Sequence, residues 1–163
     1  MITSSKALCA VLLCSAVTTA FAQVRTERNI SLSLANQIAS AGVAACAEKG
    51  YAVAVTVVDR SGQVKAMHRA DNAGPHTLAS SQQKAFTSAS AKSATLAMME
   101  GAQKNPGAAN LVYLPGFLLL GGGLPIKAGD EVIGGIGIGG APGGHLDDQC
   151  AQTALEKVKD QLK

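Results

Sequence analysis

The sequence contains no tryptophan, only two tyrosines and only three phenylalanines. The core must therefore be built from aliphatic side chains and from backbone segments that approach each other closely. The 18 glycines permit such close approach, because glycine has no Cβ atom. Neither sign of charge is in large excess, because 14 Lys and Arg and 11 Asp and Glu give a formal charge of +3. So weak a charge gives no support for a nucleic-acid partner or for binding to an acidic membrane surface.

Long apolar runs are lacking as well. The most apolar stretch, from Ala7 to Val17, is too short to span a bilayer as a helix. It follows the single charge of Lys6 and ends in Ala20-Phe21-Ala22, which is a small-x-small cleavage pattern. We therefore expect residues 1–22 to be a signal peptide that is removed before Gln23. An uncleaved N-terminal anchor is the alternative.

Cleavage would leave one domain at 23–163, which has 141 residues (163 minus 22) and a formal charge of +2, since Lys6 is lost from the +3 of the whole chain. A chain of this length can bury a sizeable core. We expect it to be periplasmic or secreted, with no stable membrane insertion after cleavage.

Two cysteines, Cys46 and Cys150, remain after the expected cleavage. In an oxidising compartment, two thiols most simply form one disulfide. Their separation would give about 4–5 kcal/mol of stabilisation in the chain-entropy model. The alternative is two buried free thiols. A zinc site is not expected, because neither cysteine has a Cys or His partner at zinc-like spacing.

Hydrophobic periodicity predicts the order α-β-β-α-β-β-β-α. The expected elements are a helix at 31–49, strands at 51–59 and 63–71, a long helix at about 76–100, three short strands within 116–140, and a last helix containing Cys150. The strand at 51–59 is almost entirely apolar, which is typical of a strand buried on both faces. Two tight turns indicate hairpins. The sequence thus predicts an α+β fold with an antiparallel sheet flanked by helices.

The segment Gly135–Gly140 matches G-x-G-x-x-G. A dinucleotide site needs this motif between a strand and a helix of a βαβ unit. Here the motif lies mostly within the last expected strand, so we do not expect a nucleotide. Glycines inside a strand instead allow another backbone, or a flat ligand, to approach closely.

Of the three histidines, His76 is the candidate ligand. It opens the long helix, and a helix N-terminus disfavours the imidazolium and keeps the ring neutral. A neutral imidazole is what a metal or a haem iron requires. The residues alone leave equally open that His76 merely starts the helix. We expect His68 and His145 to be ordinary surface or half-buried side chains.

Other chemistry-bearing residues are few. Lys84 lies on the same helix as His76 and could reach an acidic ligand, although a solvated lysine is the default. Asp147 and Asp148 are typical of favourable charge in a first helical turn. We find no nucleophile motif and no acid–base pair, so the sequence does not predict an enzyme. The absence of C-x-x-C-H excludes covalent c-type haem.

Taken together, these segments resemble the GlcG/HbpS family of haem-binding or haem-degrading-like domains. The similarity covers about Leu32 to Leu162 and is carried by VAVTVVDRSGQVKAMHRADNAGPHT, KAFTSAS, GGGLPIKAGDEVIGGIGIGGAPGG and DDQCAQTAL. The resemblance implies a profilin-like α/β domain with about five antiparallel strands. It also implies self-association as a dimer or a larger ring.

For the site, the resemblance implies a haem cofactor. The A-G-P-H-T segment matches a subgroup pattern, which favours His76 as the iron ligand, with Thr77 and Lys84 lining the same site. Three hypotheses follow. The first is an exported haem-binding protein for haem handling or redox protection, whose glycine-rich strands offer a flat surface. The second is an enzyme acting on a small polar metabolite near His76 and Lys84. The third is an assembly module without chemistry, using exposed glycine-rich strands for subunit contacts.

Overall fold

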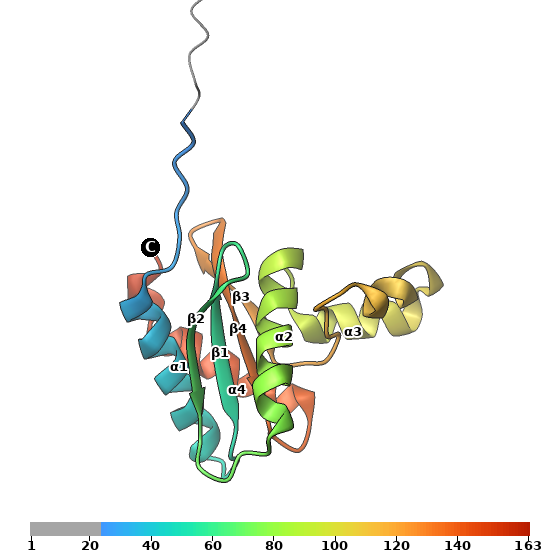
Figure 1. Cartoon of the computed structure of the whole chain (residues 1–163), viewed down its shortest axis with the longest axis horizontal. Helices are drawn as coiled ribbons and strands as arrows, with labels where there is room; N and C mark the ends of the chain where they lie inside the picture. Colours follow the sequence, from blue (N-terminus) through green and yellow to red (C-terminus); the bar gives the residue numbers. More distant parts are fainter. Residues whose placement is uncertain (1–23) are drawn as a thin grey trace, which may run out of the picture.

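Residues 24–163 are described by the computed structural model, so the expected signal peptide at 1–22 lies outside the described residues. One antiparallel sheet has the strand order β2-β1-β4-β3. Its strands are β1 (Ala54–Asp59), β2 (Val64–Arg69), β3 (Gly123–Ala128) and β4 (Glu131–Gly139). Helices α1 (Leu32–Ala47) and α4 (Gly144–Lys157) cover one face, and α2 (His76–Ala91) covers the other (Figure 1). This is the expected α+β architecture with one strand fewer.

The central strand β1 is buried on both faces, as its apolar sequence predicted, because helices cover both sides of the sheet. Val55 and Val57 belong to the main core between the sheet, α1 and α4, together with Ile38 and Ile136. The opposite face is different in character, since only Val58, Ala85 and Ala89 form an apolar cluster there. No helix within residues 24–163 is long and apolar enough to cross a membrane.

The predicted disulfide is present in the structure. Cys46 of α1 and Cys150 of α4 are joined, and both are completely buried. The two cysteines are 104 residues apart, so the bond fastens the first and last α-helices of the fold to each other. A bond that closes so long a loop restricts the unfolded chain strongly.

Helix α2 lies with its backbone directly on the glycines of β4. A Cβ atom on Gly137 would be 2.0 Å from the carbonyl oxygen of Ser81, and one on Gly135 would be 2.5 Å from that of Ala85. The glycine motif therefore admits another backbone rather than a flat ligand. Since β4 is buried from Val132 to Gly139, the expected flat haem surface and the expected exposed strands for subunit contacts are both wrong.

The predicted long helix at 76–100 is two helices. Helix α2 ends at Ala91, its C-cap Lys92 adopts a left-handed conformation (φ 53°), and α3 runs from Thr95 to Lys104. The expected end of the long helix near residue 100 lies within α3, which continues to Lys104. No glycine or proline marks the break in the sequence, so the helical periodicity of the apolar residues predicted one continuous helix.

The expected strand near residues 117–121 does not form. Its backbone is held by threonine hydroxyls instead: the Leu118 N–H donates to Thr87 Oγ1, and Thr95 Oγ1 donates to the Leu120 carbonyl and accepts from the Gly123 N–H. The segment therefore satisfies its polar groups on α2 and α3 without pairing with another strand. This is why the sheet has four strands instead of five.

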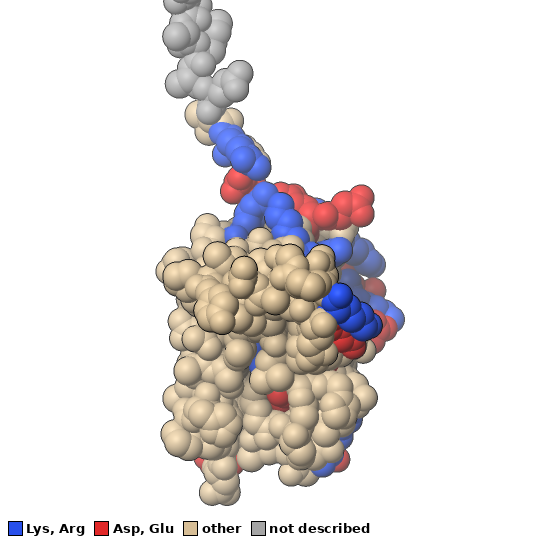
Figure 2. Space-filling view, turned by 90° about the vertical axis from the view of Figure 1, so that its right-hand side faces the viewer, with Lys and Arg blue, Asp and Glu red and all other residues tan. Residues whose placement is uncertain are grey.

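Residues 95–113, comprising α3 and the 3-10 helix η1 (Pro106–Tyr113), form a segment that projects from the body of the domain (Figure 1). We call this segment the arm. Seen from the side toward which it projects, the arm overhangs a hollow in a surface that is almost free of charged side chains (Figure 2).

We predict that Gly137→Ala destabilises the domain by more than about 3 kcal/mol, because the added methyl group would collide with the α2 backbone. Gly101→Ala is the matched control, since a Cβ there meets no atom within 4 Å and alanine favours a helix by about 0.5–1 kcal/mol over glycine. Urea unfolding of both variants measures the difference. Equal stabilities would contradict the close contact between α2 and β4.

Candidate functional site

A pocket of ≈ 270 Å³ lies where the beginning of α2 meets the loop after β4 and the beginning of α4. Three α2 side chains line it, those of His76, Ser80 and Lys84, with Leu120 and Asp147 from other segments. The rest of its wall is the glycine-rich segment 139–144. The structure therefore brings together two of the predicted site residues, His76 and Lys84.

Two other hollows are larger, but no buried titratable side chain lines them. One of ≈ 330 Å³ on another side of α2 is lined by Gly62, Ala79, Gln82, Gln83, Phe86 and Gly116, none of which is titratable. One of ≈ 450 Å³ between β3 and α4 is an open groove, and its charged lining residues, Lys127, Glu156 and Lys159, are exposed. Ligand sites combine a concave surface with convergent polar groups. By that criterion the pocket at His76 and Lys84 is the candidate site.

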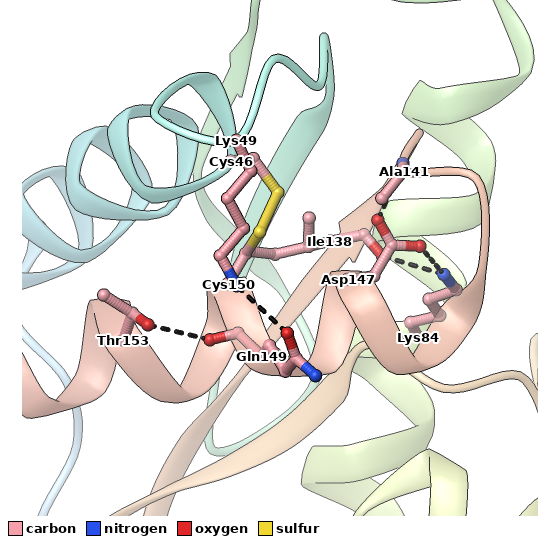
Figure 3. Close-up of a disulfide and its surroundings, with 9 residues drawn as sticks. All are labelled: Cys46, Lys49, Lys84, Ile138, Ala141, Asp147, Gln149, Cys150 and Thr153. Carbon is pink, nitrogen blue, oxygen red and sulfur yellow. Dashed lines mark hydrogen bonds and ion pairs between the residues drawn. A yellow bond between two sulfur atoms is a disulfide. The ribbon is translucent and has the colours of Figure 1, made fainter.

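Lys84 is buried at the base of this pocket, with only 1% of its surface exposed, so the expectation of a solvated lysine is wrong. Its Nζ donates to Asp147 Oδ2 at 2.8 Å and to the Ile138 carbonyl oxygen at 2.8 Å. Figure 3 shows the two charged side chains pointing toward each other from α2 and α4. Because the two residues are 63 positions apart, their pairing left no local signal in the sequence.

Asp147 lies in the first turn of α4, as expected, and it is buried as well. Its second oxygen, Oδ1, accepts the backbone N–H of Ala141 at 3.0 Å. Burial raises the pKa of the Asp147 carboxyl above its ordinary value, and the charge of Lys84 and the hydrogen bonds from Lys84, Ala141 and Gly140 offset only part of that rise. The pocket thus holds a paired acid and base.

The Lys84–Asp147 pair needs glycine on the backbone beside it. Gly122 adopts φ +113°, and a Cβ there would lie 2.6 Å from the Cβ of Asp147 and 3.1 Å from the Nζ of Lys84. Gly140 adopts φ +133° where the chain leaves β4 and turns toward α4. The ion pair and its hydrogen bonds therefore connect α2, the end of β4, the loop after β4 and the start of α4.

His76 is the first residue of α2 and is exposed at the rim of the pocket. Within residues 24–163, its ring forms no hydrogen bond. Gly74 allows this position, since a Cβ there would lie 2.7 Å from His76 Cε1. Thr77 is buried behind it and donates from Oγ1 to the Gly74 carbonyl at 2.7 Å. Thr77 thus fixes the loop that carries His76, while the imidazole stays accessible.

The other histidines have the ordinary environments that we expected. His68 on β2 is half-buried, and its ring nitrogens lie 3.3 Å from Ser40 Oγ and 3.4 Å from Asn36 Oδ1, both on α1. His145 is exposed in the first turn of α4. Among the described residues, no group of three or more His, Cys, Asp or Glu could hold a metal ion.

Asp148, the neighbour of Asp147, is buried as well. Its Oδ2 accepts a hydrogen bond from Gln152 Nε2 at 2.7 Å, and its Oδ1 has no partner within residues 24–163. The two neighbouring carboxylates thus have separate buried environments.

The size of the pocket limits what it can hold. Sites that enclose a drug-sized ligand have volumes of about 300–1,000 Å³, so this pocket cannot enclose a porphyrin. A haem could only lie across the rim, where His76 is accessible. A small polar molecule could instead enter and reach Lys84 and Asp147. The geometry therefore allows a surface-bound cofactor at His76 or a small ligand inside.

Known proteins share this fold and much of this sequence. A family model described as "Haem degrading protein HbpS-like" matches residues 30–156. Protein GlcG of Escherichia coli K12 is 30% identical over 115 residues, which cover 71% of this chain and 84% of that protein.

Two solved structures are similar. The crystal structure of a double mutant of Streptomyces reticuli HbpS has a TM-score of 0.77 and 36% identity, over 83% of this chain and 90% of that one. A structure titled as the PduOC:Heme complex has a TM-score of 0.70 and 26% identity, over 78% of this chain and 94% of that one.

We predict that Lys84→Met destabilises the domain by about 3–5 kcal/mol at neutral pH, because it leaves a buried carboxylate without its counter-charge. Lys84→Met/Asp147→Asn is the control, and it should be more stable than the single variant because no charge remains buried. Urea unfolding measures both.

The deficit of Lys84→Met should also depend on pH. Losing Lys84 raises the pKa of Asp147 further, so the folded variant holds its proton more tightly than the unfolded chain does. A raised carboxyl pKa has no effect on stability below the unfolded-state value, and it lowers stability progressively as pH rises from that value to the folded-state one. The difference from the unmodified protein should therefore grow as pH rises above about 4, the ordinary pKa of an aspartate. A difference that shrinks over this range contradicts the assignment.

Proposed function

The chain belongs to the HbpS-like family of haem-degrading proteins, and on that premise we propose that it is an exported haem-binding protein. The family match covers most of the described domain. The similarity to the PduOC:Heme complex adds support, because that related domain is named as holding haem. Haem handling or redox protection would follow from such binding.

The observation that carries this proposal is the accessible imidazole of His76 at the rim of a pocket. An axial ligand must offer an unprotonated ring nitrogen toward an open space, and the ring of His76 lies at the surface. Bound haem would supply iron redox chemistry. The chain would supply the ligand atom, its orientation through Gly74 and Thr77, and the surface on which the macrocycle rests.

The residues around His76 fit a haem that lies across the rim and not inside the pocket. Leu120 lines the same pocket, and 41% of its surface is exposed, so it provides apolar contact for a flat ligand. Lys84 offers no free charge to a haem propionate, because Asp147 already pairs with it. Binding would rest on the imidazole and on apolar contact.

We further propose that the protein works in the periplasm or outside the cell, after residues 1–22 are removed. The buried disulfide supports an oxidising compartment. Among residues 24–163, the first backbone hydrogen bond to the sheet is the one from the Ile30 N–H to the Ile133 carbonyl, which lies after the proposed cut.

A second candidate function is chemistry on a small polar metabolite inside the pocket. The Lys84–Asp147 pair favours it, since it provides the acid–base couple that the sequence did not reveal. The raised pKa of Asp147 brings that carboxyl closer to the range in which an acid catalyst operates. The small volume of the pocket agrees with a small substrate.

Self-association is also part of the proposal. One side of the domain, around α2 and the arm, exposes few charged side chains (Figure 2). Such a surface is compatible with contact between subunits.

We predict that hemin titration of the chain from Gln23 to Lys163 gives a Soret band. The His76→Ala variant should bind hemin at least about tenfold more weakly, because even the loss of a residue that only hydrogen-bonds a metal ligand lowers metal affinity by that factor. His68→Ala is the control, because His68 lies on β2 against Ser40 and Asn36 of α1, away from the pocket. If both variants titrate like the unmodified protein, His76 is not the iron ligand.

The second candidate makes a separate prediction. Small carboxylic and hydroxy acids that fit the pocket should raise the melting temperature of the unmodified protein, and Ser80→Ala, at the pocket wall, should reduce that rise. Differential scanning calorimetry with acetate, lactate and malate tests it. If none of the three shifts the melting temperature while hemin binds, the haem proposal alone remains.

A further inference from the structure

Lys84 has a hydrogen-bond donor to spare. A lysine ammonium group carries three N–H bonds. Within residues 24–163, one of them is used by Asp147 Oδ2 and one by the Ile138 carbonyl oxygen, each at 2.8 Å. Lys84 is almost completely shielded from water, yet it lines the pocket of ≈ 270 Å³. A buried donor without an acceptor is costly, so a molecule in the pocket that offers an oxygen atom would relieve that cost.

The walls of the pocket also present donors. Helix α2 begins at His76 and α4 begins at Gly144, and both residues line the pocket. The first N–H groups of a helix have no acceptor within that helix, and the helix dipole places partial positive charge there. The spare donor of Lys84 comes from a buried side chain and does not depend on either helix start. Together these donors favour a ligand with an anionic oxygen.

The charge already present limits how such a ligand can bind. Lys84 and Asp147 neutralise each other at 2.8 Å, and Figure 3 shows the two side chains directed toward one another. A carboxylate added beside them would leave one uncompensated negative charge in a largely buried space. An isolated buried charge is so costly that titratable groups there change their protonation instead. Asp147 is the group that can be neutralised, because burial already raises the pKa of its carboxyl.

Few other titratable groups face Asp147. Lys84 and His76 come from α2, and His76 lies at the rim of the same pocket. On α4 itself, His145 is exposed, and Asp148 is buried in a separate environment. The charged residues on or next to the other elements that pack against α4 do not line the pocket; they are Glu48, Lys49, Glu100, Lys104, Lys127 and Glu131. Among the residues that line the pocket, His76 is therefore the one alternative place for a proton.

We propose that the pocket binds small monocarboxylic acids together with one proton from solvent. The carboxylate of the ligand would accept the spare N–H of Lys84, and Asp147 would hold the proton as a neutral carboxylic acid, so the only covalent bond that forms is that O–H bond. This rests on the second candidate function, and it adds the class of ligand and a dependence of binding on pH. It does not depend on whether the protein binds haem.

Two properties of ligand binding follow. Since one proton enters with the ligand, affinity should fall about tenfold for each pH unit over which Asp147 is ionised in the free protein and protonated in the complex. A dicarboxylate should bind less tightly than a monocarboxylate of the same framework, because one proton on Asp147 cannot neutralise a second negative charge.

Isothermal titration calorimetry of the chain from Gln23 to Lys163 tests both properties. Lactate and malate are the ligands, because malate adds a second carboxylate to a small 2-hydroxy acid. Titrations in two buffers with different ionisation enthalpies give the number of protons taken up. At about pH 6, above the ordinary pKa of an aspartate, we expect close to one proton per lactate. Malate should bind at least about tenfold more weakly, since like charges in one site disfavour each other.

Two variants identify the group that takes up the proton. Uptake should vanish in Asp147→Asn, whose amide has the same shape as the carboxyl but cannot take up the proton, and it should persist in His76→Ala. Circular dichroism melts establish that each variant folds. If Asp147→Asn does not fold, the unmodified protein and His76→Ala still decide, because Asp147 is then the remaining group in the pocket that can take up a proton.

The outcomes separate this inference from the function on which it rests. If neither acid gives a heat of binding or a shift in melting temperature, the second candidate function and this inference are overturned together. Lactate binding without proton uptake, uptake that is lost in His76→Ala or kept in Asp147→Asn, or equal affinity for malate would overturn this inference alone.

Discussion

The buried ion pair between Lys84 and Asp147 is the interaction on which the candidate site depends. It joins α2 to α4 across the end of β4, and both partners are almost completely shielded from water. A buried pair of this kind adds little net stability compared with an apolar substitute, but losing one partner is costly. Its consequence here is geometric: it fixes the glycine-rich loop and the start of α4 relative to α2, and so defines the pocket with His76 at its rim.

The pair can exist only because α2 lies unusually close to the sheet. The glycines of β4 let the α2 backbone contact the strand directly, so the inner face of α2 is made of small and polar residues. Ser81 uses this closeness to bond Thr56 of β1 at 2.8 Å. Lys84, on the same face, crosses the end of β4 to reach Asp147. The low aromatic content and the many glycines of the sequence therefore favour the close contact between α2 and β4, and the same contact brings Lys84 within reach of Asp147.

Much of the fold could be predicted because its signals are local: the apolar β1 strand, the hairpin turns, the amphipathic end helices and the two cysteines. The missing fifth strand could not, because threonine hydroxyls from distant parts of the chain bind its backbone. The break after α2 could not, because a left-handed lysine ends the helix where the sequence has no glycine or proline. At the site, the sequence predicted the helix start at His76, and the structure places His76 there, at the rim of the pocket. The role of Asp147 was missed because its partner is distant in sequence, although Lys84 lies on the same helical face as Ser81 and Ser88, which was an available sign of burial.

The central claim is that the ligand binds at the rim formed by His76 and the loop before α4. An NMR titration of the ¹⁵N-labelled chain with zinc protoporphyrin, a diamagnetic analogue of haem, tests it most directly. The account predicts that the largest amide shifts fall on His76 and on residues 140–147. Shifts confined to Gly62 and Gly116, beside the larger hollow on α2, or to Lys127 and Gln152, beside the open groove at β3, would contradict it.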